Sequence, residues 1–219
     1  NFADVVRAFK EKYRVIIPIM PIYARSKVKP TVSGLSEFVH AFVTFKKLKQ
    51  FAILGNSLGG HIGLIYTLKY QEYVSSLTLT GSSGLYESGM GSSFPKRGSY
   101  EYIKERVEYT FFSPKTATKD LVDEVFQIVN DNLAALRILR FARSAQNHNM
   151  RTELDKIKIP TLLIWGLNDN ITPPRVAHEF DQLIPNTELH FIDECGHAPM
   201  MEQGEQFNSI MDQFLLKNS

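Results

Sequence analysis

Short apolar runs alternate along this chain with longer segments in which apolar residues recur every three to four positions. The runs are rich in β-branched side chains, which is typical of strands that are buried on both faces of a parallel sheet. The longer segments have the period of helices that cover such a sheet. The pattern therefore predicts an α/β fold with a mostly parallel central sheet flanked by helices. The predicted strands are residues 15–19, 51–54, 77–80, 161–165 and 189–192.

The alternation is interrupted once, between about residues 84 and 154. A Gly/Ser-rich stretch over residues 89–93, which we expect to be a mobile loop, precedes three helical patterns and no strand pattern. We therefore expect residues 85–154 to be a helical insertion in a core made of residues 1–84 and 155–219. The predicted helices of the insertion are residues 100–112, 118–129 and 132–145, and those of the core lie at residues 2–9, 35–45, 62–69, 174–183 and 207–214.

Composition narrows the functional classes. Lys and Arg number 25 against 23 for Asp and Glu, so the formal net charge of +2 gives no reason to expect nucleic acid or an anionic membrane as partner. No apolar run reaches the roughly 20 residues of a membrane span. The single cysteine, Cys195, excludes an internal disulfide and favours a reducing compartment, which predicts a cytoplasmic protein. The oligomeric state is left open.

One segment has the form of a nucleophile turn. Residues 55–60, GNSLGG, join the predicted strand 51–54 to a helix, in the order strand, G-x-S-x-G, helix. A serine in so tight a turn takes a strained backbone conformation, and we expect Gly55 and Gly59 to give the neighbouring strand and helix room to approach. The turn lifts the Ser57 hydroxyl clear of the sheet and places the Leu58 N–H at the positive end of the helix. Ser57 is the candidate nucleophile and the Leu58 N–H a candidate oxyanion donor.

A serine nucleophile needs a base, and the base needs an orienting acid. His197 lies in a loop after the last predicted strand, at the sheet edge where active sites of open α/β sheets are found. Asp169 follows the strand 161–165 in the same way, whereas the rival acid Asp193 lies only four residues before His197. The order Ser57, Asp169, His197 matches one of the known orders of such triads. The other histidines fall in helical patterns or inside a strand: His40, His61, His148, His178 and His190.

These segments together resemble the α/β-hydrolases. ILGNSLGGHIG, PTLLIWGLNDNITP and CGHAPMMEQ are similar to the elbow, acid and histidine segments of that family, and the resemblance extends from residue 15 to the C-terminus. It implies Ser57 as nucleophile, His197 as base and then acid, Asp169 as the orienting carboxylate, and residues 85–154 as a helical cap over the site.

The resemblance also indicates which residues contact the substrate and which elements of the fold are expected before residue 1. Asn56, Tyr23 and Met200 are expected to touch the substrate. Family members form the second oxyanion donor in a loop that would lie upstream of residue 1, together with a strand between those at residues 15–19 and 51–54. We therefore expect the native protein to have additional N-terminal residues, enough for about three strands.

The predicted reaction is hydrolysis of a small or medium acyl substrate such as a carboxylic ester, through an acyl-enzyme. One alternative is carbon–carbon bond hydrolysis of ring-cleavage products, in which Arg137, Arg140 or Arg143 would hold a substrate carboxylate. Another is a non-catalytic binding protein with the same fold. No cofactor is implied, and the histidine and glycine spacings fit neither a zinc motif nor a phosphate loop. Aromatic residues in the insertion are divided between helix packing and an apolar pocket: Tyr100, Tyr102, Tyr109, Phe111, Phe112, Phe126 and Phe141.

Overall fold

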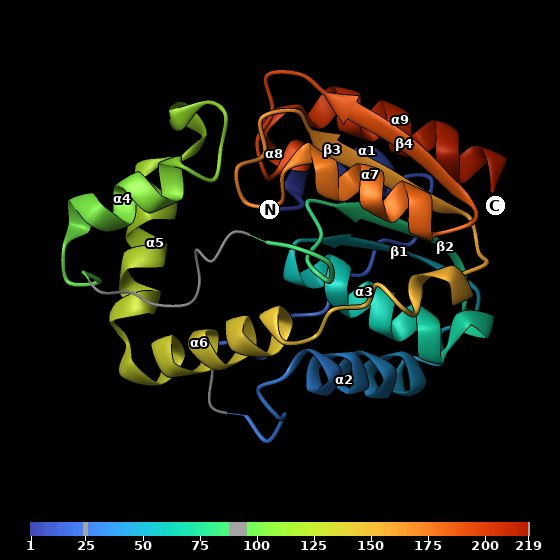
Figure 1. Ribbon diagram of the computed structural model, residues 1–219, viewed down its shortest axis with the longest axis horizontal. Coiled ribbons are helices and arrows are strands. Elements are labelled where there is room, and N and C mark those ends of the chain that lie inside the picture. The colour runs from blue at the N-terminus through green and yellow to red at the C-terminus, as the bar shows by residue number, and fades with distance from the viewer. Residues whose placement is uncertain (24–25, 88–95, 219) are drawn as a thin grey trace.

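A four-stranded parallel sheet forms the centre of the molecule (Figure 1). The computed structural model describes residues 1–23, 26–87 and 96–218, so the predicted loop at residues 89–93 lies outside the described residues. The strands are adjacent in chain order, with every neighbouring pair parallel, which confirms the predicted fold class and four of the five predicted strands. They are β1 (Phe51–Asn56), β2 (Val74–Thr80), β3 (Thr161–Gly166) and β4 (Thr187–Ile192).

Strand β3 shows why its sequence is apolar throughout. Leu162 and Ile164 pack into one core cluster, and Leu163 and Trp165 pack into the cluster on the opposite face of the sheet. Successive side chains of a strand point to opposite faces, so a strand covered on both sides has no position for an exposed polar residue.

The predicted strand at residues 15–19 is wrong. These residues have no regular secondary structure, and Ile17 and Ile19 are 51% and 92% exposed. Within the described part of the chain, β1 is hydrogen bonded to β2 alone, and no strand pairs with residues 15–19. A β-branched apolar run becomes a strand only where a neighbouring strand completes its hydrogen-bond ladder.

Helices cover both faces of the sheet. Helix α3 contacts β1 and β2, and α7 contacts β3 and β4, while α9 lies against β3 and β4 with α1 packed on it. All the helices predicted from periodicity are present. The α-helices of the described residues are α1 (Ala3–Phe9), α2 (Val32–Phe45), α3 (Leu58–Lys69), α4 (Tyr100–Glu108), α5 (Lys119–Asn130), α6 (Asn132–Gln146), α7 (Pro174–Leu183), α8 (Pro199–Glu202), which was not predicted, and α9 (Gly204–Lys217). There are 3₁₀ turns at Gln71–Tyr73, Pro114–Thr116 and Leu154–Lys156.

Helices α4, α5 and α6 fall between β2 and β3 in the sequence. Figure 1 shows α4 and α5 set apart from the sheet, beyond the ends of the strands near α8. The side chains of Ser99, Thr118 and Asp131 cap these three helices by accepting a hydrogen bond from the N–H three residues later. The division into a core and a cap at residues 85–154 stays a prediction. In the described part of the chain, no helix is long and apolar enough to cross a bilayer.

Candidate active site

The serine turn sits at the junction of β1 and α3. Ser57 has φ 55° and ψ −120°, so the strained backbone expected of this position is present. Three backbone hydrogen bonds hold it. Its N–H donates to the Thr80 carbonyl at 3.1 Å, and its carbonyl accepts from the N–H groups of His61 at 3.2 Å and Ser83 at 3.3 Å. Leu58 is the first residue of α3, where a helix leaves backbone N–H groups without an intrahelical partner.

The glycines of the turn differ from the expectation at one position. A Cβ on Gly55 would lie 2.5 Å from the backbone of Gly59, so Gly55 is needed for the close approach of strand and helix. A Cβ on Gly59 would meet nothing within 4 Å, whereas one on Gly60 would lie 2.3 Å from the Ser82 hydroxyl. The second close approach therefore belongs to Gly60, because that residue faces the end of β2 while Gly59 is exposed.

Asp169 and His197 lie together beyond the ends of β3 and β4. His197 Nδ1 is 2.9 Å from Asp169 Oδ2, and both side chains are buried, at 8% and 1% exposed. Asp169 also accepts the N–H groups of Ile171 and Thr172 on Oδ1, at 2.8 and 2.9 Å, and the Thr172 hydroxyl on Oδ2 at 2.9 Å. A carboxylate fixed in this way holds a proton on Nδ1 of the imidazole, which leaves Nε2 as the basic nitrogen.

The rival groups lie elsewhere. Asp193 is exposed and accepts a hydrogen bond from the N–H of Glu194. Cys195 is fully buried, and burial raises the pKa of its thiol, so it is a packing residue. In the part of the chain that the structure describes, no cluster of three or more His, Cys, Asp or Glu side chains is arranged to hold a metal ion.

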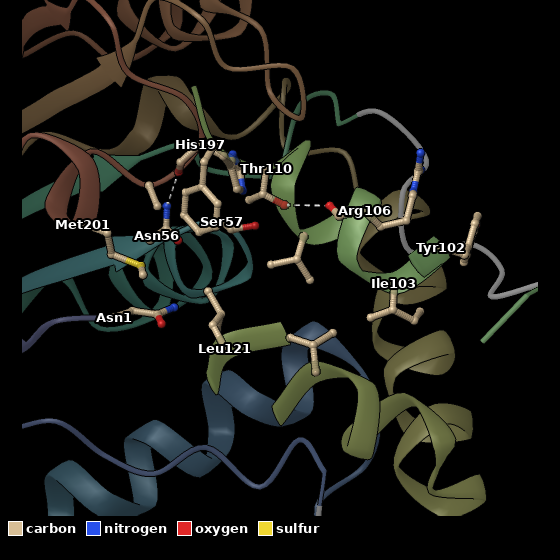
Figure 2. Close-up of a pocket in the computed structure, with 14 residues that line it drawn as sticks. Asn1, Asn56, Ser57, Tyr102, Ile103, Arg106, Thr110, Leu121, His197 and Met201 are labelled. Carbon is tan, nitrogen blue, oxygen red and sulfur yellow. Dashed lines mark hydrogen bonds between the residues drawn. The ribbon is translucent and has the colours of Figure 1, made fainter. Parts of the chain in front are cut away.

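A cavity of about 330 Å³ opens between the serine turn and the helices of the insertion (Figure 2). Ser57, His197 and Asn56 lie at one end of it, and most of the remaining wall is apolar. No described residue is hydrogen bonded to the Ser57 hydroxyl; catalytic hydrogen bonds are commonly loose before substrate binds. The other lining residues are Asn1, Tyr102, Ile103, Arg106, Val107, Thr110, Phe111, Leu121, Val125, Ala198 and Met201.

The residues predicted to contact the substrate differ in their position relative to the cavity. Asn56 lines the cavity, but its amide donates to the carbonyls of Thr80 and His197, both at 3.0 Å, so its nitrogen holds the serine and histidine segments together. Met200 is fully buried in the core, whereas Met201 lines the cavity, so a substrate contact of Met200 stays a prediction. Both residues are in the short helix α8, where consecutive side chains point about 100° apart.

Tyr23 and the arginines of α6 also lie away from the cavity. Tyr23 is half exposed, outside the cavity lining, and burial together with the nearby Glu124 raises its pKa. Arg137 is buried and donates to the carbonyls of Ile22 and Pro21, so it holds backbone. Among the described lining residues, Arg106 of α4 has a charged side chain, which the sequence did not single out; its guanidinium lies over the Tyr109 ring and points away from Ser57 (Figure 2). Of the predicted aromatic lining, Tyr102 and Phe111 are present.

Two further residues fix the histidine loop. Gly81, directly after β2, has φ +49°, and a Cβ there would lie 2.8 Å from His197 Nδ1. Glu202 accepts the N–H of Gly196 on one carboxylate oxygen and the N–H groups of Phe112 and Ser113 on the other. Glu202 thereby ties the segment after α4 to the loop of His197. In the sequence, the position of Gly81 directly after a strand could have identified it, whereas no local pattern identifies Glu202.

Comparisons with known proteins identify the family of the chain. The sequence matches the family described as "Serine aminopeptidase, S33" over residues 25–204. It is 38% identical to MGS-MChE2, an alpha/beta hydrolase enzyme from the metagenome of sediments from the lagoon of Mar Chica, Morocco, whose crystal structure has a TM-score of 0.78, with 98% of this chain and 84% of that one covered. It is 26% identical over 227 residues to the 2-hydroxy-6-oxononadienedioate/2-hydroxy-6-oxononatrienedioate hydrolase of Escherichia coli K12, covering 94% of this chain and 77% of the relative. It is 27% identical over 208 residues to the monoacylglycerol lipase of Bos taurus, covering 84% and 61%.

Proposed function

The chain belongs to the serine aminopeptidase S33 family and is an α/β-hydrolase, and within that family we propose that it hydrolyses carboxylic ester-like acyl substrates through an acyl-enzyme on Ser57. The observation that carries the proposal is the buried hydrogen bond of 2.9 Å between Asp169 and His197, since His197 lines the same cavity as Ser57 with its φ of 55°. A buried carboxylate on Nδ1 stabilises the imidazolium that forms when Nε2 takes a proton.

The proposed cycle uses these groups in turn. Ser57 attacks the substrate carbonyl while His197 accepts its proton. The Leu58 N–H, at the positive end of α3, donates to the oxyanion of the tetrahedral intermediate. His197 then protonates the leaving alcohol, and in the second half it activates the water that hydrolyses the acyl-enzyme.

The cavity walls support an apolar acyl group. Side chains of α4 and α5, with Met201 from α8, would surround a chain of several carbons beyond the carbonyl. The charged side chain on the wall is the cation Arg106, and no carboxylate is among the described lining residues. A free amino group would find no carboxylate among these lining residues, so the lining favours an ester over the amino-terminal residue of a peptide.

Carbon–carbon hydrolysis of ring-cleavage products is the second candidate. The Escherichia coli relative is named as a hydrolase of that class, and Arg106 places a cation among the cavity lining residues, although its guanidinium lies over the Tyr109 ring and would have to turn to hold a substrate carboxylate. We rank it second because Arg106 is one cation on an otherwise apolar wall, and the proposed chemistry at Ser57 needs no anionic group.

Labelling with a fluorophosphonate, followed by intact mass, tests the proposal without knowledge of the substrate. We expect one adduct on the wild type and none on Ser57→Ala or His197→Ala, with Asp193→Asn as the matched acid control that labels normally. Hydrolysis of p-nitrophenyl esters of two to eight carbons is then compared with cleavage of a vinylogous diketone acid. Efficient cleavage of the diketone acid with negligible ester turnover would reverse the ranking. The absence of any adduct on folded wild type would favour the non-catalytic binding protein.

A further inference from the structure

A buried histidine behind the serine turn has no part in the proposed chemistry. His61 lies one turn into α3 and is fully buried. Its Nε2 is 3.0 Å from Nδ1 of His148, and its Nδ1 is 3.3 Å from the hydroxyl of Ser83. Both ring nitrogens of His61 therefore have a partner, and none of the three residues lines the cavity.

The protonation of His61 follows from its surroundings. Burial, and secondly the nearby His148, lower the pKa of His61 to about 3, so the ring is neutral wherever a serine hydrolase works. A neutral imidazole has one donor and one acceptor. With the N–H at Nε2, the ring donates a hydrogen bond to His148 Nδ1 and accepts one from the Ser83 hydroxyl; with the N–H at Nδ1, both directions reverse. In either arrangement the side chains of His61, His148 and Ser83 are hydrogen bonded to one another, so His61 connects the other two.

Its first connection leads to the nucleophile. The carbonyl of Ser57 accepts the N–H groups of His61 and Ser83, and the hydroxyl of Ser83 returns to the His61 ring. A residue with φ 55° and a side chain keeps that conformation only if its surroundings fix it by several independent contacts. His61 supplies one such contact through its backbone and supports a second through its side chain.

Its second connection leads to the helices of the insertion. His148 follows the end of α6, beside the place where the chain enters and leaves the insertion. There Met150 N–H donates to the Gly84 carbonyl at 2.8 Å, and the Asn149 amide donates to the Leu85 carbonyl at 3.0 Å. Helix α6 packs on α5, and α5 on α4, whose side chains form the apolar wall.

We propose that His61 is a positioning residue that couples the backbone of Ser57 to the helices over the cavity, through Ser83 on one side and His148 on the other. It touches no substrate. The hydrogen bond to His148 fixes where the chain returns from α6, and with it the distance between the wall and the serine. The effect on substrates rests on the proposed function of Ser57, whereas the coupling itself does not.

Hydrogen–deuterium exchange tests the coupling without catalysis. His148→Ala removes the bond to His61, and His148→Asn keeps a polar group near the position of Nδ1. We expect exchange of peptides covering residues 57–63 and 82–87 to be about tenfold faster in His148→Ala, the loss of roughly one hydrogen bond's net contribution, and near wild type in His148→Asn. The control is Arg151→Ala, in the same returning segment, whose side chain pairs with Glu179 of α7. Unchanged exchange around Ser57 in His148→Ala, or equal acceleration in the control, would overturn the proposal.

Kinetics then separate positioning from mere stability. We expect His148→Ala to raise KM for p-nitrophenyl octanoate about fivefold to tenfold while kcat for the acetate ester stays within twofold, and His148→Asn to restore the octanoate value. An equal change for both esters would show a general loss of structure and refute the positioning role. A wild type that takes no fluorophosphonate refutes the proposed function of Ser57, and the exchange result still decides the coupling.

Discussion

Replacing Gly81 tests whether the placement of His197 sets the rate. A Cβ at this position would lie 2.8 Å from His197 Nδ1, 2.9 Å from Cε1 and 2.9 Å from the His197 carbonyl oxygen. Unstrained contacts between such atoms are about 3.5 Å or longer, so in Gly81→Ala the ring has to move by roughly 0.5–1 Å. Its bond of 2.9 Å to Asp169 cannot survive such a shift unchanged.

The expected magnitude has two parts. Misplacing a catalytic group by about 1 Å costs on the order of 100-fold in rate, which corresponds to about 2.7 kcal/mol of activation free energy. Separately, φ +49° disfavours alanine by about 1–2 kcal/mol, which lowers the melting temperature by roughly 2–8 °C for a chain of this size. The rate loss therefore exceeds what partial unfolding would produce at room temperature.

The assay is hydrolysis of p-nitrophenyl butyrate at 20 °C, with the rate of fluorophosphonate labelling and a thermal melt measured beside it. Gly98→Ala is the control, because a Cβ on Gly98 meets nothing within 4 Å and its φ is not in the left-handed region. We expect kcat/KM to fall about 100-fold in Gly81→Ala and to stay within twofold in Gly98→Ala. A Gly81→Ala enzyme within twofold of wild type in both hydrolysis and labelling would refute the reasoning.

Three further outcomes are expected. Gly59→Ala keeps wild-type hydrolysis and the wild-type urea midpoint, whereas Gly60→Ala, whose Cβ would lie 2.7 Å from the Ser82 Cβ, unfolds at a lower urea concentration. Equal urea midpoints of the two variants would contradict this contact. Thr172→Val removes a hydrogen bond to the buried Asp169 carboxylate and lowers the unfolding free energy by about 1.5–3 kcal/mol in urea titrations. His61 has a folded pKa of about 3, below its unfolded value, so its contribution to stability is present above about pH 6.5 and is lost as pH falls. Between pH 7 and 5 the loss is about 2 kcal/mol, and a His61→Asn variant whose unfolding free energy falls just as steeply would disprove it.

The sequence predicted most of the elements because their signals are local. Apolar periodicity marks β1 to β4 and the helices, and the glycines of the serine turn mark a strand that reverses into a helix. The exception, residues 15–19, shows the limit of that signal. The run has the composition of a strand, but a strand is defined by its neighbour, and within the described residues none pairs with it.

The candidate site was predictable where residue type and chain order were enough. Ser57, Asp169 and His197 each follow a strand at the same edge of a parallel sheet, and that topology brings their segments together. Residue type does not report the phase of the short helix α8, so the sequence could not show that Met200 is buried in the core while Met201 lines the cavity.

The sequence by itself thus determined the order of strands and helices, the strained turn at Ser57 and the segments that would supply an acid and a base. Tertiary structure decided which atoms meet: that Ile171 and Thr172 hold the Asp169 carboxylate against the imidazole, that Gly81 lies beside the ring, and that Arg106 is among the described cavity lining residues. The physical reason is the distance along the chain over which each kind of interaction acts. Periodicity and turn chemistry act within a few residues, whereas these contacts join segments tens of residues apart, so only the packed chain specifies them.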